Sequence, residues 1–224
     1  MFFYYKWLQI KKYRFYAMGY SKREEFLNCI SHIFAAVLSA VAGAYLICRA
    51  QHLGHFKVLS VFVFAATAVF AFASSALYHG ANGKIKLKFK LLDHIAIFFM
   101  TFGVFFAAAS LSSMPIFWTA ALSFAMLFAA ITGSIMKIKK GTDGTKRWSV
   151  LFYTIMPSAI IAPMFFMPPV SVLLFLIAAV FDLTGLFFYL KKNAEFAHAI
   201  WHIFSALTIA GDFCAVYTLI ELNA

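Results

Sequence analysis

The 224-residue chain is 64% hydrophobic and only 12% charged, a balance that excludes a soluble globular protein. Its formal net charge of +11 could suggest nucleic acid as a partner, but the basic residues form small groups between long apolar segments, where anionic lipid headgroups would meet them. The composition therefore predicts an all-α, polytopic membrane protein that does not bind nucleic acid.

The first 24 residues form a basic, aromatic segment. Aromatic side chains alternate there with lysine and arginine, as in Phe2, Lys6, Trp7 and Arg14. This pattern suits a segment on the cytoplasmic side or in the inner membrane interface, and a disordered basic tail remains an open alternative. No apolar core is followed by a small-residue cleavage site, so no signal peptide is expected.

After this segment the chain divides into seven apolar stretches of about 20 residues, the length that spans about 30 Å of hydrocarbon at 1.5 Å per residue. We expect one domain over residues 1–224, built as a seven-helix transmembrane bundle. The expected spans are 28–48, 58–79, 91–110, 115–136, 148–166, 169–190 and 197–219.

The distribution of positive charge predicts the orientation of these spans. If the N-terminus is inside, all of the 19 basic residues except Arg49 and Lys57 lie in cytoplasmic loops or in the N-terminal segment, Lys191 and Lys192 among them. Cytoplasmic loops of membrane proteins carry an excess of lysine and arginine. The expected topology is therefore N-terminus inside and C-terminus outside, in agreement with an odd number of spans.

Polar side chains gather at the cytoplasmic ends of several spans. Glu25, Asn28 and His32 stand at helical spacings at the start of the first span. Ser75 and His79, one turn apart, close the second span, and Asp93 opens the third. This topology brings all of these groups to one depth in the inner leaflet.

The seventh span supplies two further imidazoles. His198 and His202 are four residues apart at its cytoplasmic start, so both face the same side of a helix, at the depth of His79. Three neutral imidazoles with a fourth position left open are a ligand set of catalytic zinc. The pattern predicts a zinc site in which Asp93 orients water or accepts its proton.

Each of these residues also has a purely structural interpretation. A single histidine near a membrane interface can simply bond a carbonyl, and Asp93 can cap the start of its helix. Ser75, Glu25, Asn28 and His32 are expected around the ligands rather than as ligands. His94 is the main competing ligand, but its side chain should point about 100° away from that of Asp93.

Two carboxylates are predicted inside the hydrocarbon. Asp182 lies in the sixth span and Asp212 in the seventh, where an unpaired ionised carboxylate is costly. From the helix rise they should stand at depths of about 12 Å and 20 Å, too far apart to touch without an intervening water. We expect them to line a central cavity, with a neutral hydrogen-bonded role as the alternative.

In this order the motifs resemble the haemolysin III family, which is grouped with the progestin and adipoQ receptors and, more distantly, the alkaline ceramidases. The phrases Ser74-Ser75-Ala76-Leu77-Tyr78-His79 and His198-Ala199-Ile200-Trp201-His202 carry the resemblance, which extends from Glu24 to about Ala215. It implies a seven-helix bundle in a bacterial inner membrane, with zinc on His79, His198 and His202.

The resemblance also implies candidate functions. In the receptor and ceramidase relatives this site is linked to hydrolysis of lipid amides such as ceramide, so the resemblance implies a zinc-dependent hydrolase of membrane lipid amides or esters. A receptor-like or membrane-homeostasis protein with structural zinc, and a cytolytic pore, are the alternatives. The chain departs from the family at Met100-Thr101-Phe102-Gly103, where a Tyr-Thr-Pro triplet is usual, and at Asp182 and Asp212.

Overall fold

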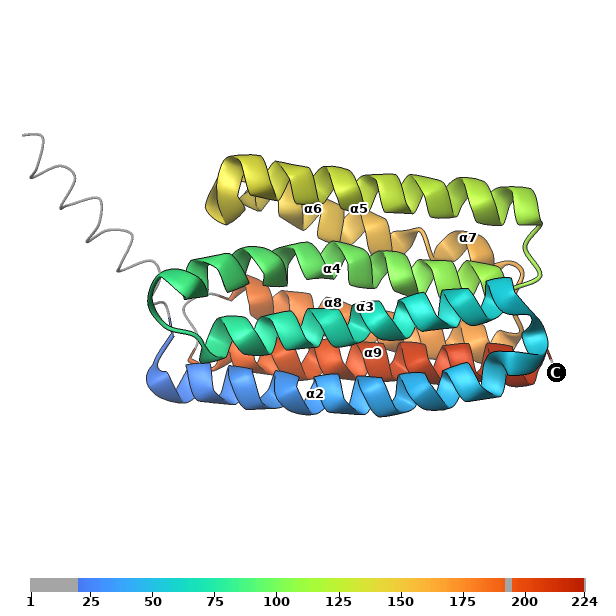
Figure 1. Ribbon diagram of the computed structural model, residues 1–224, viewed down its shortest axis with the longest axis horizontal. Coiled ribbons are helices and arrows are strands. Elements are labelled where there is room, and N and C mark those ends of the chain that lie inside the picture. Colours follow the sequence, from blue (N-terminus) through green and yellow to red (C-terminus); the bar gives the residue numbers. More distant parts are fainter. Residues whose placement is uncertain (1–19, 192–194, 224) are drawn as a thin grey trace, which may run out of the picture.

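The protein is an all-helical bundle. The computed structural model describes residues 20–191 and 195–223, and these residues contain helices and no strand. The long helices run roughly parallel to one another (Figure 1), which confirms the predicted all-α membrane fold. Most of the predicted segment 1–24, up to residue 19, lies outside the described residues, as does Lys192.

Six helices in the described residues are long and apolar enough to cross a membrane. Their outward faces carry large hydrophobic side chains such as Phe34, Phe124 and Leu173, each more than half exposed, as contact with lipid requires. These six are α2 (Lys22–Arg49), α3 (His55–Gly80), α4 (Gly83–Leu111), α5 (Ile116–Gly144), α8 (Pro169–Leu190) and α9 (Ala197–Glu221). The shorter elements are a 3-10 turn, η1 (Ala50–Leu53), and the helices α6 (Lys146–Ser158) and α7 (Ile161–Met164).

The fifth predicted span differs from the expected single helix. It is divided into α6 and the short α7, because Pro157 and Pro163 each lack a backbone N–H and a proline ring clashes with the preceding helical turn. The intervening backbone closes tight turns instead, with Ala159 N donating to Met156 O and Ile160 N to Pro157 O. The fifth predicted span is therefore a broken helix.

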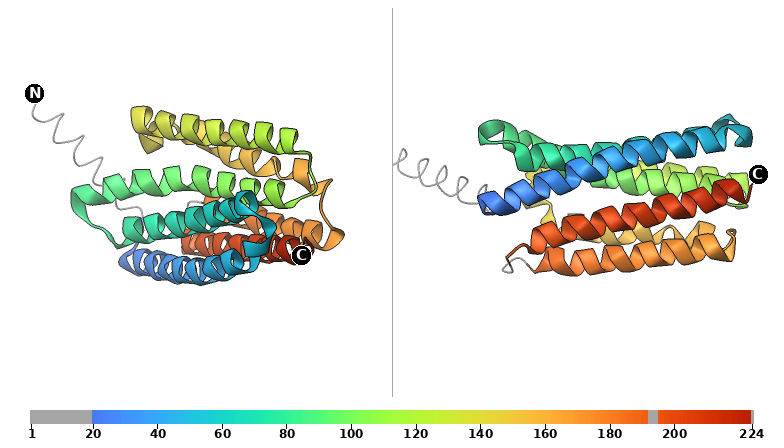
Figure 2. Two further views of the ribbon diagram at one scale, coloured as in Figure 1. Left: turned by 45° about the vertical axis from the view of Figure 1, so that its right-hand side comes forward. Right: turned by 90° about the horizontal axis from the view of Figure 1, so that it is seen from below.

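The helices are arranged so that α2 contacts α3 and α9, α3 contacts α4, and α8 contacts α9. The helices α5, α6 and α7 lie together on the far side of α4 from α2 (Figures 1 and 2). Gly103 allows the close approach of α3 and α4. A Cβ atom at this position would clash with the Thr67 side chain and lie 3.1 Å from Phe64 Cα.

The two ends of the bundle are chemically different. At one end, the Arg49 guanidinium donates to both carboxylate oxygens of Glu221, at 2.9 and 2.7 Å, and joins α2 to α9. At the other end lie the starts of α2, α4 and α9 and the end of α3. Here Ser21 and Glu24 form a capping box that begins α2. The polar groups predicted to cluster belong to this end.

Candidate metal centre

Three histidines from two helices converge at the polar end of the bundle. His79 stands in the last turn of α3, and His198 and His202 stand in the first two turns of α9. One ring nitrogen from each can be chosen so that all three lie within 4.8 Å of one another. This spacing suits a single metal ion that the three imidazoles share.

The triad is largely shielded from solvent. His202 is fully buried, His79 is 4% exposed, and His198 is half-buried. Neither ring nitrogen of His202 has a hydrogen-bond partner among the described residues. A buried imidazole without a partner loses its hydrogen bonds to water and gains nothing in return. A bound cation would remove this cost, so the residues present fit a metal.

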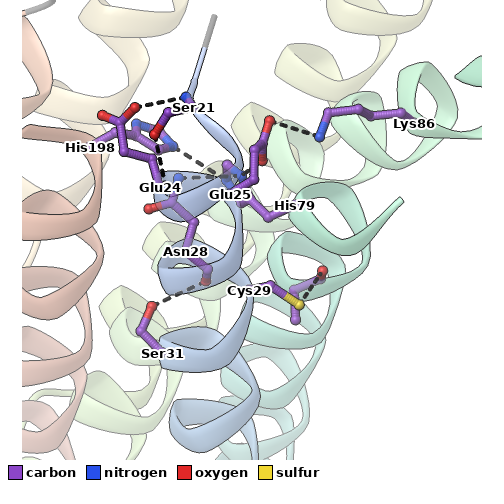
Figure 3. A network of polar contacts seen from close by, with 10 residues as sticks. Ser21, Glu24, Glu25, Asn28, Cys29, Ser31, His79, Lys86 and His198 are labelled. Carbon is purple, nitrogen blue, oxygen red and sulfur yellow. Dashed lines mark hydrogen bonds and ion pairs between the residues drawn. The ribbon is translucent and has the colours of Figure 1, made fainter. Parts of the chain in front are cut away.

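The orientation of the His79 ring is set by an acidic residue of α2. Its Nδ1 lies 2.7 Å from Glu25 Oε2, while Glu25 Oε1 accepts a hydrogen bond of 2.9 Å from Lys86 Nζ (Figure 3). With Nδ1–H donating to the carboxylate, Nε2 presents its lone pair to the other histidines. A carboxylate behind a ligating histidine is the common outer arrangement of metal sites.

The distance between the imidazoles of His79 and His198 also favours a bound cation. His79 Nε2 and His198 Nε2 are 3.3 Å apart. If both nitrogens carry lone pairs, they repel one another unless a proton or a metal ion lies between them. The geometry therefore provides a place for positive charge.

Other residues predicted near the ligands lie around the triad. Asn28 is buried, with its Nδ2 3.4 Å from His79 Nδ1. The His32 ring stacks on that of His202, with centroids 3.7 Å apart, and is not one of the three grouped ligands. Ser75 is buried, and its hydroxyl has no hydrogen-bond partner among the described residues.

Asp93 is a buried carboxylate in α4. It is 7% exposed and lies close enough to His79 and His32 to interact electrostatically with both. The capping role considered for it is wrong, because α4 begins at Gly83, well before Asp93. A helix-capping role therefore does not explain why the Asp93 carboxylate is buried beside the triad.

The prediction that His94 points away from Asp93 is also wrong. The His94 ring turns back along α4, and its Nδ1 lies 2.8 Å from Lys90 O and 3.5 Å from Asp93 Oδ2. Helical spacing describes where side chains leave the backbone, whereas the rotamer decides where a ring nitrogen ends. His94 remains outside the three grouped ligands, as expected.

Two contributors were missed by the sequence analysis. Lys86 is seven residues before Asp93 on α4, so both side chains lie on the same face of that helix. This spacing was the available signal that Lys86 faces the site. Tyr20, just before the α2 cap, stacks on His198 with ring centroids 4.5 Å apart. Burial raises the pKa of the Tyr20 phenol well above its usual value.

A further contact joins the two helix starts. Phe196 precedes α9 with a positive φ of 59°, and its backbone N–H donates to Glu24 Oε1 at 2.9 Å. Glu24 therefore takes part in the α2 capping box and also holds the beginning of α9. This contact places His198 and His202 beside the α2 residues that surround His79.

Comparison with known proteins identifies the family of this chain. The family model described as Haemolysin-III related matches residues 20–215. The chain belongs to the haemolysin III family. A curated relative of this family, Hemolysin-3 of Bacillus cereus, is 31% identical over 190 residues, which cover 81% of this chain and 85% of the relative. The resemblance predicted from Glu24 to about Ala215 is confirmed, and the haemolysin III match includes the whole triad, Glu25 and Asp93.

Proposed function

We propose that this haemolysin III protein is a zinc-dependent hydrolase of membrane lipid amides or esters. The observation that carries the proposal is the convergence of His79, His198 and His202, with Glu25 bonded behind His79. A ligand set of three imidazoles, without a thiolate, is typical of catalytic rather than structural zinc. A zinc ion bound there would supply Lewis acidity and lower the pKa of a water molecule.

The chain's own residues would divide the remaining work. Glu25, held by Lys86, keeps the His79 proton on Nδ1 and so keeps Nε2 available as a ligand. Asp93 is the nearby carboxylate that can orient water and accept its proton. Asn28 and Ser75 add polar atoms around these groups, and the stacked ring of His32 supports His202.

The position of the site favours a lipid substrate. The triad lies at the ends of apolar helices whose outer surfaces are covered with large hydrophobic side chains. A lipid could present its polar amide or ester linkage at this level while its chains remain in the hydrocarbon. We therefore propose membrane lipids as partners, the cytoplasmic face as the side of the site, and the cell membrane, such as a bacterial inner membrane, as its location.

A structural metal is a second candidate, and the contacts of His79 with two other helices favour it. His79 on α3 is in contact with His198 on α9, so an ion at the triad would join these two helices, and the contact between His79 and Glu25 would connect α2 to them. A receptor-like or membrane-homeostasis protein could use zinc in this way. In that case metal removal lowers stability, and no hydrolysis exists to be lost.

The first experiment measures metal content by mass spectrometry on detergent-purified protein. We expect about one zinc per chain in the native protein and almost none in His198→Ala/His202→Ala. The matched control is His52→Ala/His55→Ala, which removes two histidines from the opposite end of the bundle and should leave zinc unchanged. No zinc in the native protein would contradict the proposal.

A second experiment separates the two candidates. The native protein and Asp93→Asn are assayed for release of fatty acid from lipid amides and esters in vesicles. Catalysis predicts hydrolysis by the native protein, and full zinc content with greatly reduced hydrolysis in Asp93→Asn. Zinc binding with no hydrolysis by the native protein, and a melting temperature that falls on chelation, would establish the structural candidate.

A further inference from the structure

A second polar site lies away from the triad, in the interior of the bundle. A cavity of about 120 Å³ is lined by residues of α4, α6, α8, α9 and the turn before α7, and both Asp182 and Asp212 line it. Each aspartate is at least about 12 Å from the nearer end of its helix at 1.5 Å per residue. The two carboxylates that the sequence placed at different depths therefore share one cavity.

Asp212 is a buried acid without a partner. It is only 6% exposed, and it forms no hydrogen bond or ion pair with any described residue. Asp182 is partly exposed, so the cavity is not closed on that side. An unpartnered carboxyl group in hydrocarbon is costly in either protonation state, which indicates that something else satisfies it.

The remaining polar groups of the cavity are also acceptors. Thr101 Oγ1 donates its hydrogen to Ile97 O at 3.0 Å, and Thr208 Oγ1 donates to Phe204 O at 2.9 Å. Their oxygen lone pairs remain available. Thr208 lies one turn from Asp212 on α9, so the oxygen atoms form one acceptor-rich region. The ligand must therefore bring hydrogen-bond donors or positive charge.

The rest of the wall is apolar. Met100, Phe105, Met156, Ile160 and Phe175 are among the side chains that line it. A metal ion such as calcium would require six to eight oxygen ligands, and this wall would supply few of them. A primary ammonium group carries three donors and one charge, and an attached hydrocarbon chain would suit the apolar wall.

We infer that this cavity binds the protonated amino group of an amphiphile, with the hydrocarbon part of the ligand against the apolar wall. One carboxylate is ionised and pairs with the ammonium group, while the other keeps its proton and forms a hydrogen bond. The bound state then has no net charge, as a site in hydrocarbon requires. The inference is independent of the proposed hydrolase function, because none of the triad residues lines the cavity.

The test is equilibrium binding of radiolabelled octylamine to the full chain in phosphatidylcholine nanodiscs, with empty nanodiscs subtracted. We expect one saturable site per chain, weakened at least about tenfold in Asp182→Asn/Asp212→Asn, which leaves no carboxylate to form charge-assisted hydrogen bonds with the ammonium group. The matched control is Ser134→Ala, which removes a buried hydroxyl on α5 that lies outside this cavity. Its binding should equal that of the native protein.

Competition on the native protein makes the test independent of how the variants fold. Unlabelled octylamine should displace the label, whereas octanol, sodium and calcium should not. The absence of saturable binding, equal binding by a folded Asp182→Asn/Asp212→Asn, or displacement by sodium or calcium would each overturn the inference. Octylamine binding by His198→Ala/His202→Ala should match the native protein, which separates this result from the outcome for the triad.

Discussion

The contact between Glu25 and His79 gives the sharpest prediction about the metal centre. Replacing Glu25 with glutamine keeps the side-chain size but removes the negative charge that accepts the Nδ1 proton at 2.7 Å and the Lys86 hydrogen bond at 2.9 Å. Loss of such a partner behind a ligating histidine typically lowers metal affinity by about 10–100-fold. This range corresponds to about 1.4–2.7 kcal/mol of binding free energy.

Zinc affinity can be measured by competition with a chromophoric chelator in detergent. The control is Glu221→Gln, the same substitution at the opposite end of the bundle, where the carboxylate pairs with Arg49 and lies far from the triad. We expect zinc affinity to fall in Glu25→Gln and to remain unchanged in Glu221→Gln. An affinity for Glu25→Gln within about twofold of the native value would refute the role assigned to this carboxylate.

Three further predictions concern single side chains. His32→Phe keeps the ring that stacks on His202, so zinc content should remain at the native value, and a loss of zinc would show that His32 is a ligand. Gly103→Leu should lower the free energy of unfolding by about 1–3 kcal/mol, because its side chain would clash with Thr67, and a melting temperature equal to native would contradict this packing. Ser75→Ala removes a buried hydroxyl with no described hydrogen-bond partner, so thermal stability should stay level or rise, and a clear fall would reveal a partner for that hydroxyl.

Local pattern was sufficient for much of the candidate site. Residues four apart on a helix share a face, so the proximity of His198 and His202 followed from spacing alone. The prediction that His79 lies near these two histidines required one further step. The positive charges set the orientation of the spans, and this orientation brings the end of the second span to the same depth as the start of the seventh. Both steps use regular helix geometry, which holds along a continuous apolar segment.

Rotamers and contacts between helices could not be obtained in that way. The spacing placed the His94 side chain away from Asp93, but the ring turns back to approach that carboxylate. The bond from Lys86 to Glu25 joins residues 61 positions apart, and no periodicity in one segment encodes it. Side-chain torsions and the packing of neighbouring helices decide such contacts, and both are properties of the assembled bundle.

Composition and apolar segment length alone determined that this is a polytopic α-helical membrane protein, because hydrocarbon accepts only segments that satisfy their own backbone hydrogen bonds. Only the tertiary structure decided that the fifth predicted span is broken near Pro157 and which helices line the cavity that holds Asp182 and Asp212. The physical reason is that helix rise gives the depth of each residue along its own helix. The lateral packing of α8 against α9, where Gly211 lies directly beside Ala178, decides which depths meet.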